Sequence, residues 1–454
     1  SKHNSVMIIM KFGGTSVQNA EAIRRVIGIV RGRMAEKPLV VVSALSKVTR
    51  QLCSIAEAAQ GRREDEFREL LSALRKRHCD LAAELLPEGS ALLQDCLGRI
   101  GQLCDELEDF VYGVFRIAEL SPRSYARIVS TGELLSSVIV SAAMNAAGLS
   151  CHWADARRMM VTDCNYMSAA PDLEATEANV RREYPALSKG ASVILTQGFI
   201  ASSVEGFPSV LGFEGSDYSA AIFGMALNAS RVEIWTDVDG IRTADPRIVS
   251  DTGRIARLSY DEAAEMASLG ARVLHPLTIE PARKRGIPVV VLNSANPEGQ
   301  GSEVSFSGEG AGPKSIALNE EVEFLRITSP KTGGAAAMLA DVYQVLASEG
   351  LKSGPETVSE SSLNIVLEVG KTASDNAVRR LREKYEVQVL TDKALVSVVG
   401  RDVASSHEVL SALLRKSAPV HMLSASPSML SVSVVVDKAV AKSIVSALHC
   451  EYFG

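Results

Sequence analysis

The stretch that decides the fold is Val6-Met7-Ile8-Ile9-Met10-Lys11-Phe12-Gly13-Gly14-Thr15-Ser16-Val17. Residues 6–10 are continuously apolar, which is typical of a strand covered on both faces in a parallel sheet. Lys11 then stands at the carboxyl end of that strand, and Gly13 and Gly14 follow in a turn. Because glycine lacks a Cβ, we expect these two residues to let an anion approach and to adopt turn conformations closed to other residues.

The turn after this strand suits a phosphate group. Thr15 and Ser16 offer N-cap oxygens before a helix that we expect from about Asn19. Open α/β sheets bind ligands at the carboxyl ends of their strands, often with phosphate at a helix N-terminus, where free N–H groups and the helix dipole favour negative charge. The segment predicts a nucleotide phosphate site; the alternative is an ordinary strand-to-helix turn with a solvated lysine.

Composition indicates a globular protein of two or three domains. The chain has 454 residues, of which 46% are hydrophobic and 22% charged. Its net charge is −6 and only 5% of its residues are aromatic, so neither tracking of a phosphate backbone nor stacking on bases is favoured. We therefore expect no nucleic acid among its partners.

The cysteines and histidines do not suggest a metal site. The chain has seven of each, the cysteines contain no C-x-x-C pair, and the histidines form no ligand cluster. We expect reduced thiols, a cytoplasmic location and no structural metal. The first five residues lead directly into a short strand, which favours neither a signal peptide nor a membrane span.

The first half of the chain alternates apolar runs with amphipathic stretches, the pattern of βαβ units and a parallel sheet. Further strands are expected at 38–43, 128–131, 193–196, 232–235 and 289–292. Residues 51–120 are charged and helical in pattern, which predicts a helical insertion in a catalytic domain of residues 1–298.

A change of character marks the domain boundary. Residues 299–321 are rich in Gly and Ser and predict a linker. Residues 322–454 then carry two passes of short strand, helix and short strands, which indicates a pair of ferredoxin-like βαββαβ units. Such units usually bind regulators or subunits.

A second phosphate motif follows at Gly215-Ser216-Asp217. Gly215 permits a close approach, Ser216 can cap, and residues 220–228 continue as a helix, so a second helix N-terminus is available to an anion. Asp217, in the first turn, can orient Lys11. Two phosphate-facing helix ends and one lysine suit phosphoryl transfer, which chiefly requires positioning and charge neutralisation. The alternative for Asp217 is a simple complement to the helix dipole.

A third segment runs from Trp235-Thr236-Asp237 to Asp245-Pro246-Arg247 and suits base and ribose contacts, although it could be only a loop. Neither a Gly-x-x-x-x-Gly-Lys-Ser/Thr element nor a His-Arg-Asp catalytic loop occurs in the sequence, which excludes a Walker site and a protein kinase.

With these three segments in order, the chain resembles the single-function aspartate kinases of the amino acid kinase family over nearly all of its length. Further matching motifs are Ser130-Thr131-Gly132-Glu133, Thr196-Gln197-Gly198-Phe199 and Gly270-Ala271-Arg272-Val273-Leu274-His275-Pro276. The resemblance implies an α/β amino acid kinase-like sandwich with a mainly parallel central sheet, followed by two ferredoxin-like ACT units.

The resemblance also implies the reaction and its participants. The γ-phosphoryl group of ATP would pass to the β-carboxylate of L-aspartate and give 4-phospho-L-aspartate, the first step of lysine, threonine and methionine biosynthesis. Mg²⁺ would travel with the phosphates, without metal ligands from the protein. A homodimer or higher homo-oligomer and an amino-acid effector at the ACT units are expected, and no membrane partner.

Residue roles follow by resemblance. Lys11 and Asp217 form the catalytic pair, in which Lys11 neutralises charge on the transferring phosphoryl group and Asp217 holds Lys11. The matched ATP-binding residues are Lys11, Phe12, Gly13, Gly14, Gly215, Ser216, Thr236, Asp237, Arg242, Arg247, Arg272 and Val273. The matched acceptor-binding residues are Ser43, Thr49, Glu133 and Phe213, with Glu133 a partner for the substrate ammonium. At the first ACT unit, Ser359 and Glu360 match effector positions.

Two positions depart from the family pattern. Phe213 stands where the family has an Arg that pairs with the α-carboxylate of the substrate, so a bidentate charged pair is lost. Arg50 and Arg127 are predicted as replacement cations. Gly354 stands where the effector site of the family has an Asp, and the preceding run 333–337 is poor in the usual side chains, which weakens the prediction of an effector.

These departures keep two other functions open. One is a non-catalytic, ACT-bearing regulatory homologue, which Phe213 favours and an intact Lys11, Glu133 and Asp217 disfavour. The other is a related kinase that acts on a different acidic amino acid.

Overall fold

A computed structural model of the chain describes residues 6–212, 214–271, 274–330, 334–368 and 374–454. The chain divides into two compact units, the first made of Ser1–Gly240 and Leu277–Phe306 and the second of Ile241–Pro276 and Ser307–Gly454. The predicted division into a catalytic part, 1–298, and a regulatory part, 322–454, is a functional one and stays a prediction. The compact units differ from it because residues 241–276 pack with the second unit.

The first unit is built on a mainly parallel sheet. Its strands lie in the order β3-β5-β2-β1-β8-β10-β11, and every neighbouring pair is parallel except β10 and β11. β1, β2 and β5 are buried along their whole length, as their continuous apolar runs predict. The bounds are β1 Ile8–Phe12, β2 Leu39–Val42, β3 Cys151–Trp153, β5 Val193–Gln197, β8 Arg231–Thr236, β10 Val289–Asn293 and β11 Ser302–Ser305.

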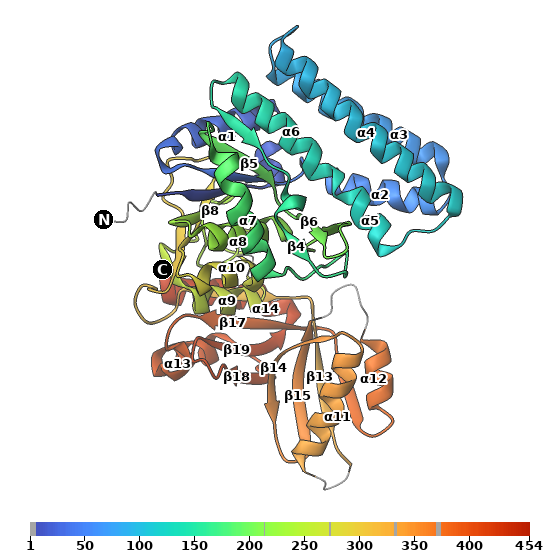
Figure 1. The fold of residues 1–454 in the computed structure, drawn as a ribbon. Helices are drawn as coiled ribbons and strands as arrows, with labels where there is room; N and C mark the ends of the chain where they lie inside the picture. The colour runs from blue at the N-terminus through green and yellow to red at the C-terminus, as the bar shows by residue number, and fades with distance from the viewer. Residues whose placement is uncertain (1–5, 213, 272–273, 331–333, 369–373) are drawn as a thin grey trace. The chain divides into compact units, whose positions relative to one another are not determined.

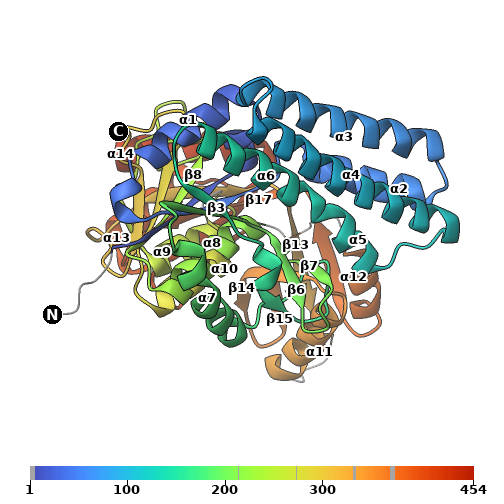
Figure 2. The same cartoon turned by 45° about the horizontal axis from the view of Figure 1, so that its top comes forward.

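Helices cover both faces of this sheet (Figures 1 and 2). One face carries α1 (Ala20–Arg31) and α6 (Thr131–Ala146), and the other carries α7 (Leu173–Ser188) and α8 (Gly215–Leu227). The predicted start of α1 is confirmed, because the Asn19 side chain accepts a hydrogen bond from the Ala22 N–H at 2.9 Å. Thr15 and Ser16 do not cap it; they lie in a short 3-10 turn, Gly14–Val17, and Ser16 Oγ instead lies 2.9 Å from Ser294 Oγ.

The predicted strand at 128–131 is wrong. These residues belong to α5 (Pro122–Val129) and the start of α6, and α5 begins with Ser121 as its cap and Pro122 at its first position. A short apolar run does not distinguish a strand from a buried helix. Within the described chain, the segment Pro122–Ala146 is long and apolar enough to cross a membrane by length and composition, and 89% of its most apolar window is buried inside the protein.

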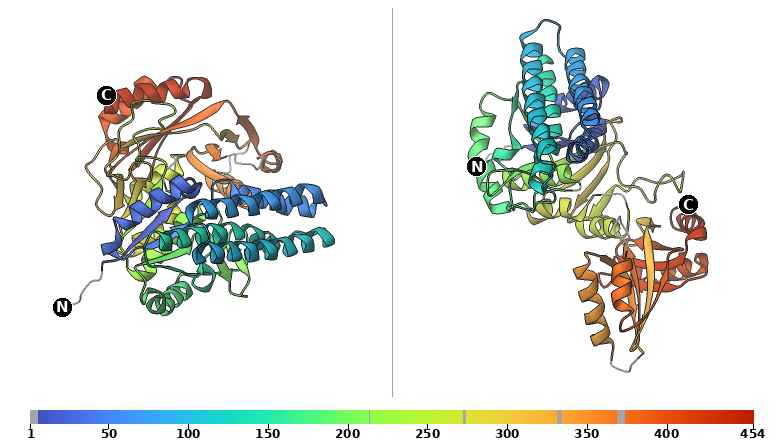
Figure 3. Two further views of the ribbon diagram at one scale, coloured as in Figure 1. Left: turned by 90° about the horizontal axis from the view of Figure 1, so that it is seen from above. Right: turned by 90° about the vertical axis from the view of Figure 1, so that its right-hand side faces the viewer.

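The segment predicted to be a helical insertion contains α2 (Val48–Gln60), α3 (Glu64–Leu85) and α4 (Ala91–Ile117). α3 and α4 run side by side as a long pair that extends beyond the sheet (Figure 3). Phe67 on α3 packs edge-on against Tyr112 and Phe115 of α4, which joins their inner faces. A small sheet of β4 (Val161–Thr162), β6 (Ile200–Ser203) and β7 (Pro208–Val210) completes the strands of this unit.

The second unit contains two antiparallel four-stranded sheets. The first has the order β14-β15-β13-β16 and forms from one continuous βαββαβ stretch. Its elements are β13 Val322–Thr328, α11 Ala335–Ser348, β14 Lys352–Val358, β15 Ser362–Glu368, α12 Asp375–Leu381 and β16 Glu386–Leu390. The first predicted ferredoxin-like unit is therefore confirmed.

The second sheet is not continuous in sequence. Its order is β12-β17-β19-β18, and its outer strand β12 (Ser315–Asn319) precedes the whole first ferredoxin-like unit. The prediction of a second consecutive pass is thus corrected, because the first ferredoxin-like unit, β13 to β16, is inserted between β12 and β17. The other elements are β17 Lys393–Val399, α13 His407–Lys416, β18 Met422–Ala425, β19 Ser431–Asp437 and α14 Lys438–Phe453. The predicted linker, 299–321, holds both β11 and β12, which its Gly-rich flanks obscured.

The segment 241–276 is tied into the second unit by specific contacts. Ala244 lies in the buried cluster around β17 and β19, and Thr243 Oγ1 lies 2.7 Å from His449 Nε2 on α14. Glu262, on α9 (Tyr260–Ser268), forms a buried ion pair of 2.8 Å with Lys314. The fold of this segment therefore depends on residues that follow it by many positions.

Candidate active site

The parallel strands bring their carboxyl ends to one edge of the sheet. Lys11 of β1 stands level with Val41 of β2 and Ile234 of β8, so the turns after these strands meet. A cavity of about 910 Å³ opens there. Its lining residues are Lys11, Gly13, Gly14, Thr15, Ser43, Ala44, Leu45, Ser46, Lys47, Thr49, Cys53, Tyr125, Val129, Glu133, Met167, Phe199, Val210, Gly212, Glu214, Gly215, Ser216, Asp217, Trp235, Thr236 and Asp237.

Lys11 and Asp217 form an ion pair in this cavity. Lys11 Nζ lies 2.7 Å from Asp217 Oδ1, and the two side chains are 10% and 14% exposed. Lys11 lies near the carboxyl end of the strand β1, and Asp217 lies in the first turn of the helix α8. The pair that the sequence predicts between a strand end and a helix start is thus present, although its catalytic role stays a prediction.

Gly13 and Gly14 are required for space and not for their backbone angles. Neither residue has a positive φ, and Gly13 has an extended backbone with φ −74. A Cβ on Gly14 would lie 3.0 Å from the Ala44 carbonyl oxygen, and one on Gly13 would lie 3.4 Å from Lys11 Nζ. The prediction that Gly13 and Gly14 adopt backbone conformations unavailable to other residues is therefore wrong. The prediction that they are needed to let other groups come close fits the contacts of Gly14 with Ala44 and of Gly13 with Lys11.

The start of α8 packs tightly against the end of β5. Ser216 Oγ accepts a hydrogen bond from Ser43 Oγ at 3.0 Å, which links the α8 start to the turn after β2. A Cβ on Gly198 would come within 2.7 Å of the Ser216 Cβ. Ser216 does not cap the helix as predicted, because the N-cap is Glu214, at φ 54, and it makes no side-chain cap hydrogen bond. The first-turn N–H groups of α8 are the kind that lack partners within a helix.

Glu133 is a buried carboxyl group in the wall of the cavity. Its Oε1 accepts a hydrogen bond from the Ala44 N–H at 3.2 Å, and its buried Oε2 has no hydrogen-bond partner among the residues that the structure describes. Burial raises the pKa of Glu133 from 4.5 to about 8, because the charged form is poorly solvated there. A cation that entered beside Oε2 would be paired with a carboxylate.

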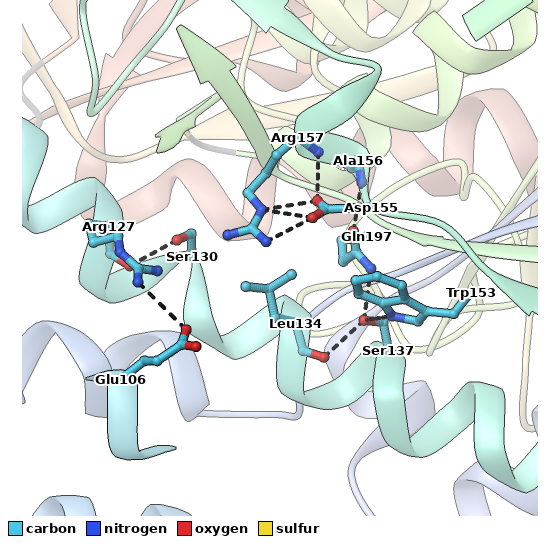
Figure 4. A network of polar contacts seen from close by, with 10 residues as sticks. All are labelled: Glu106, Arg127, Ser130, Leu134, Ser137, Trp153, Asp155, Ala156, Arg157 and Gln197. Atoms are coloured by element: carbon cyan, nitrogen blue, oxygen red, sulfur yellow. Dashed lines mark hydrogen bonds and ion pairs between the residues drawn. The ribbon is translucent and has the colours of Figure 1, made fainter. Parts of the chain in front are cut away.

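A network of polar contacts joins α6, the helix that carries Glu133, to β3 and β5 (Figure 4). Gln197, at the end of β5, accepts a hydrogen bond from the Ala156 N–H at 2.8 Å and donates one to Ser137 Oγ at 2.9 Å. Trp153 Nε1 donates to the same Ser137 oxygen at 2.9 Å. These bonds fix α6, which carries Glu133, to β5.

The structure brings most of the predicted site residues to this cavity. Of the predicted residues, Lys11, Gly13, Gly14, Ser43, Thr49, Glu133, Gly215, Ser216, Asp217, Thr236 and Asp237 line it. Phe12 does not: its buried ring stacks on Trp235 with centroids 5.9 Å apart. Phe213, Arg272 and Val273 lie outside the described residues.

Other predicted residues lie elsewhere in the chain. Arg242 and Arg247 belong to the second unit, where Arg242 donates to Thr252 Oγ1 at 3.0 Å and Arg247 pairs with Asp245. Ser359 and Glu360 also belong to the second unit, in the turn after β14. Their proposed roles in binding ATP or an effector stay predictions.

Several cavity residues have no counterpart in the sequence prediction. They are Lys47, Cys53, Tyr125, Met167, Phe199 and Glu214. Burial raises the pKa of Tyr125, whose hydroxyl group is hydrogen-bonded to Cys53. The polar turn after β2 was a signal for Lys47, since ligand contacts concentrate in turns that follow parallel strands. The described residues contain no group of three or more His, Cys, Asp or Glu placed to hold a metal ion.

Comparisons with known proteins agree with this fold. The model of the amino acid kinase family matches residues 6–293. Aspartokinase 1, chloroplastic, of Arabidopsis thaliana is 31% identical, with 99% of this chain and 80% of that protein aligned. Lysine-sensitive aspartokinase 3 of Escherichia coli (strain K12) is 32% identical, over 99% of this chain and all (100%) of that protein.

The likeness extends to three dimensions. The crystal structure of E. coli aspartokinase III in complex with aspartate and ADP superposes with a TM-score of 0.85 at 30% identity, and the match covers 99% of this chain and 100% of that one. The mainly parallel sheet and the two antiparallel sheets of this chain thus have counterparts along a whole relative. The chain belongs to the amino acid kinase family and, within it, to the aspartokinases.

Proposed function

We propose that this protein is an aspartate kinase that transfers the γ-phosphoryl group of ATP to the β-carboxylate of L-aspartate and produces 4-phospho-L-aspartate for amino-acid biosynthesis. The observation that carries the proposal is the Lys11–Asp217 ion pair of 2.7 Å, set between two glycine-bearing turns in the same cavity as the buried Glu133. The E. coli relative, whose crystal structure contains aspartate and ADP, supports the same substrates.

The phosphoryl end of the reaction uses charge and positioning. Lys11 is held by Asp217, so its ammonium group is preorganised and can neutralise charge on the transferring phosphoryl group. Gly13 and Gly14 leave room for phosphate oxygens beside it, and the first-turn N–H groups of α8 add a positive dipole end. No covalent intermediate on the protein is required.

The acceptor end uses Glu133. A substrate ammonium group beside Oε2 would supply the partner that this buried oxygen lacks and would draw Glu133 into its ionised form. Ser43 and Thr49 line the same cavity and offer hydroxyl groups to a carboxylate.

ATP would enter with Mg²⁺. This ion prefers oxygen donors and usually keeps phosphates and water as most of its ligands, so the proposal requires no metal ligand from the protein. When bound, Mg²⁺ supplies further charge neutralisation to the phosphates.

The second unit is proposed to regulate the first and to join copies of the chain into a homodimer or larger oligomer. Two ferredoxin-like sheets and the name of the lysine-sensitive E. coli relative support an amino-acid effector. Ser359 and Glu360 remain the proposed effector residues, and a cytoplasmic location is part of the proposal.

An ADP-release assay tests the function. The full chain is incubated with Mg-ATP and L-aspartate, L-glutamate, N-acetyl-L-glutamate or no acceptor, and hydroxylamine traps any acyl phosphate. We expect ADP release and hydroxamate formation with L-aspartate. Lys11→Ala should reduce turnover on the order of a thousandfold, because it removes a preorganised charge from the transferring group.

Other results would point elsewhere. Turnover with a different acceptor alone would replace aspartate as the substrate. Absence of turnover with every acceptor, from a folded chain that binds ATP, would favour the regulatory homologue.

A further inference from the structure

Positive charge decides how this cavity could hold its substrates. Among the described residues, its lining contains the side chains of two cations, Lys11 and Lys47. Lys11 is already paired with Asp217. ATP brings a phosphate chain, and aspartate brings an α-carboxylate in addition to the carboxylate that reacts. The α-carboxylate therefore needs a partner, and the sequence has Phe213 where the resemblance led us to expect an Arg.

Lys47 stands in an anchored turn. It follows β2 and precedes α2, with φ 71, a left-handed conformation that non-glycine residues seldom adopt. The Ser46 N–H donates to the Gly14 carbonyl at 3.1 Å, and the Ser46 carbonyl accepts from Arg77 Nη1 at 2.8 Å. Residues held in such backbone conformations cluster at active sites and ligand clamps.

The Lys47 side chain is available for a ligand. It is exposed on the cavity wall, and no ion pair of Lys47 exists among the described residues. A flexible ammonium group with three donors suits a carboxylate that must enter and leave.

The cations predicted to replace the lost Arg are less suitable. Arg127 lies 3.9 Å from Glu106, within the network of Figure 4, and it does not line the cavity. Arg50 is exposed and does not line it either. Neither residue stays a candidate on this geometry.

The same turn also meets Glu133. The Ala44 N–H donates to Glu133 Oε1, and Lys47 follows three residues later. The turn 44–47 therefore brings a carboxylate and an ammonium group to one wall of the cavity, which is the charge pattern complementary to an α-amino acid, with its ammonium and its carboxylate.

We propose that Lys47 binds the α-carboxylate of the acceptor and makes the enzyme select substrates that carry one. The inference rests on the proposed function, because it assigns a specificity residue to the aspartate site. Lys47 supplies the positive charge that this carboxylate requires. It leaves phosphoryl chemistry to Lys11 and Asp217.

The test compares two acceptors that differ only at the α-carboxyl group. L-aspartate and its α-amide, L-isoasparagine, present the same β-carboxylate, so both can accept a phosphoryl group. For Lys47→Met we expect kcat/KM for L-aspartate to fall roughly 10- to 100-fold, mainly through KM, because a charged hydrogen-bonded pair is lost. kcat/KM for L-isoasparagine and KM for ATP should stay within about twofold of wild type.

Two matched variants control the test. Lys47→Arg keeps the charge and should restore most of the preference for L-aspartate. Arg50→Met removes a cation of the same segment that does not line the cavity, and should change neither acceptor. Met and Lys are both unbranched at Cβ, so the left-handed backbone is equally demanding in both, and thermal midpoints should match.

The outcomes separate the two levels of the proposal. Equal losses for both acceptors, or a raised KM for ATP alone, would overturn the role of Lys47 and place it at a phosphate. If the wild-type chain turns over neither acceptor but does turn over another, the proposed function fails before the role of Lys47 arises. An unchanged ratio of kcat/KM between the two acceptors in Lys47→Met would overturn the inference while leaving the aspartate kinase intact.

Discussion

At the scale of single residues, Glu133 shows how burial in a binding site disfavours the ionised form of a carboxyl group. The free protein buries a carboxyl group whose Oε2 has no partner, and its pKa rises to about 8. In the unfolded chain the same group ionises near 4.5. The folded chain therefore holds more protons than the unfolded chain between these values, and the contribution of Glu133 to stability falls as pH rises through this window.

Glu133→Gln should separate stability from acceptor binding. The variant has no group that ionises at this position, so its stability should exceed that of wild type by an amount that grows from pH 5 to pH 8.5. The difference in the free energy of unfolding should reach roughly 3 to 5 kcal/mol, and the thermal midpoint should rise with it. kcat/KM for L-aspartate should drop at least about tenfold, since an amide cannot pair with the ammonium group. Thermal melts and ADP-release kinetics across pH measure both quantities. A pH-independent difference in thermal midpoint would show that Glu133 does not titrate as described.

Residue roles were predictable where they follow from the position of strand and helix ends. Lys11 and Asp217 meet because parallel strands and their following helices meet at one edge of a sheet, and that is a property of the pattern. The polar turn after β2 pointed to the segment that holds Lys47, but not to Lys47 itself, because the direction of the chain there depends on the left-handed backbone of Lys47, at φ 71. The apolar pattern of a sequence carries no information on such a backbone angle.

At the scale of elements, the junction of β5 with α8 is the closest fit in the site. Gly198 directly follows β5 and faces Ser216 in the first turn of α8, with room for hydrogen but not for a methyl group. The phosphate-facing end of α8 is thereby held against the sheet. Small displacements of this helix end would move Asp217 away from Lys11.

Gly198→Ala should therefore lower activity through element packing. The new Cβ would lie 2.8 Å from the Ser216 Cα, so α8 or β5 must shift. We expect a loss of about 1 to 3 kcal/mol in stability and a tenfold or larger fall in kcat/KM for ATP. Gly28→Ala on α1 is the matched control, because its Cβ meets nothing within 4 Å and should leave activity unchanged. Normal activity in Gly198→Ala would mean that the helix end tolerates the shift.

The sequence predicted most strands of the central sheet but misplaced one. β1, β2, β5, β8 and β10 coincide with largely apolar runs that we predicted as strands, whereas the run at 128–131 belongs to a helical segment buried on most sides. A helix without a polar face lacks the 3.6-residue alternation of apolar and polar residues by which a helix is recognised in a sequence. β12 was missed for a different reason, because its five residues directly follow a glycine-rich stretch and resemble the end of a linker.

At the scale of the whole molecule, the insertion of one ferredoxin-like unit into the other governs which parts can be removed. β12 and β17 are antiparallel neighbours, paired from Ser315 with Val399 to Asn319 with Leu395. The ends of β12 and β17 that flank the insertion therefore lie side by side. The first ferredoxin-like unit therefore occupies the position of the loop in a β12–β17 hairpin.

This arrangement predicts a deletion that the fold tolerates. Replacing residues 322–390 with a short turn that contains Asn-Gly should join β12 to β17 as an ordinary hairpin and preserve the second sheet. We expect a soluble chain with kinase activity and without any response to an amino-acid effector. Thermal melts and ADP release with and without lysine measure this. Retained inhibition would place the effector outside the deleted unit.

A truncation ending near Ala311 is the contrasting variant. It removes β12 together with the partners of 241–276, including His449 for Thr243 and Lys314 for Glu262. It should lose oligomer contacts and effector response as well, but with poor solubility, because the cluster around Ala244 is exposed. A truncated chain with wild-type stability and unchanged mass in solution would contradict both this expectation and the proposed oligomer.

The interruption between β12 and β17 also sets an order of events during synthesis. The ribosome releases β12 before it has made any of residues 322–390, and the partner strand β17 appears only after them. The first ferredoxin-like unit is continuous in sequence, so it can fold as soon as it emerges. During that time the backbone N–H and C=O groups of β12 lack the partner strand β17. Its length of five residues limits the edge that a neighbouring nascent chain could capture during that interval.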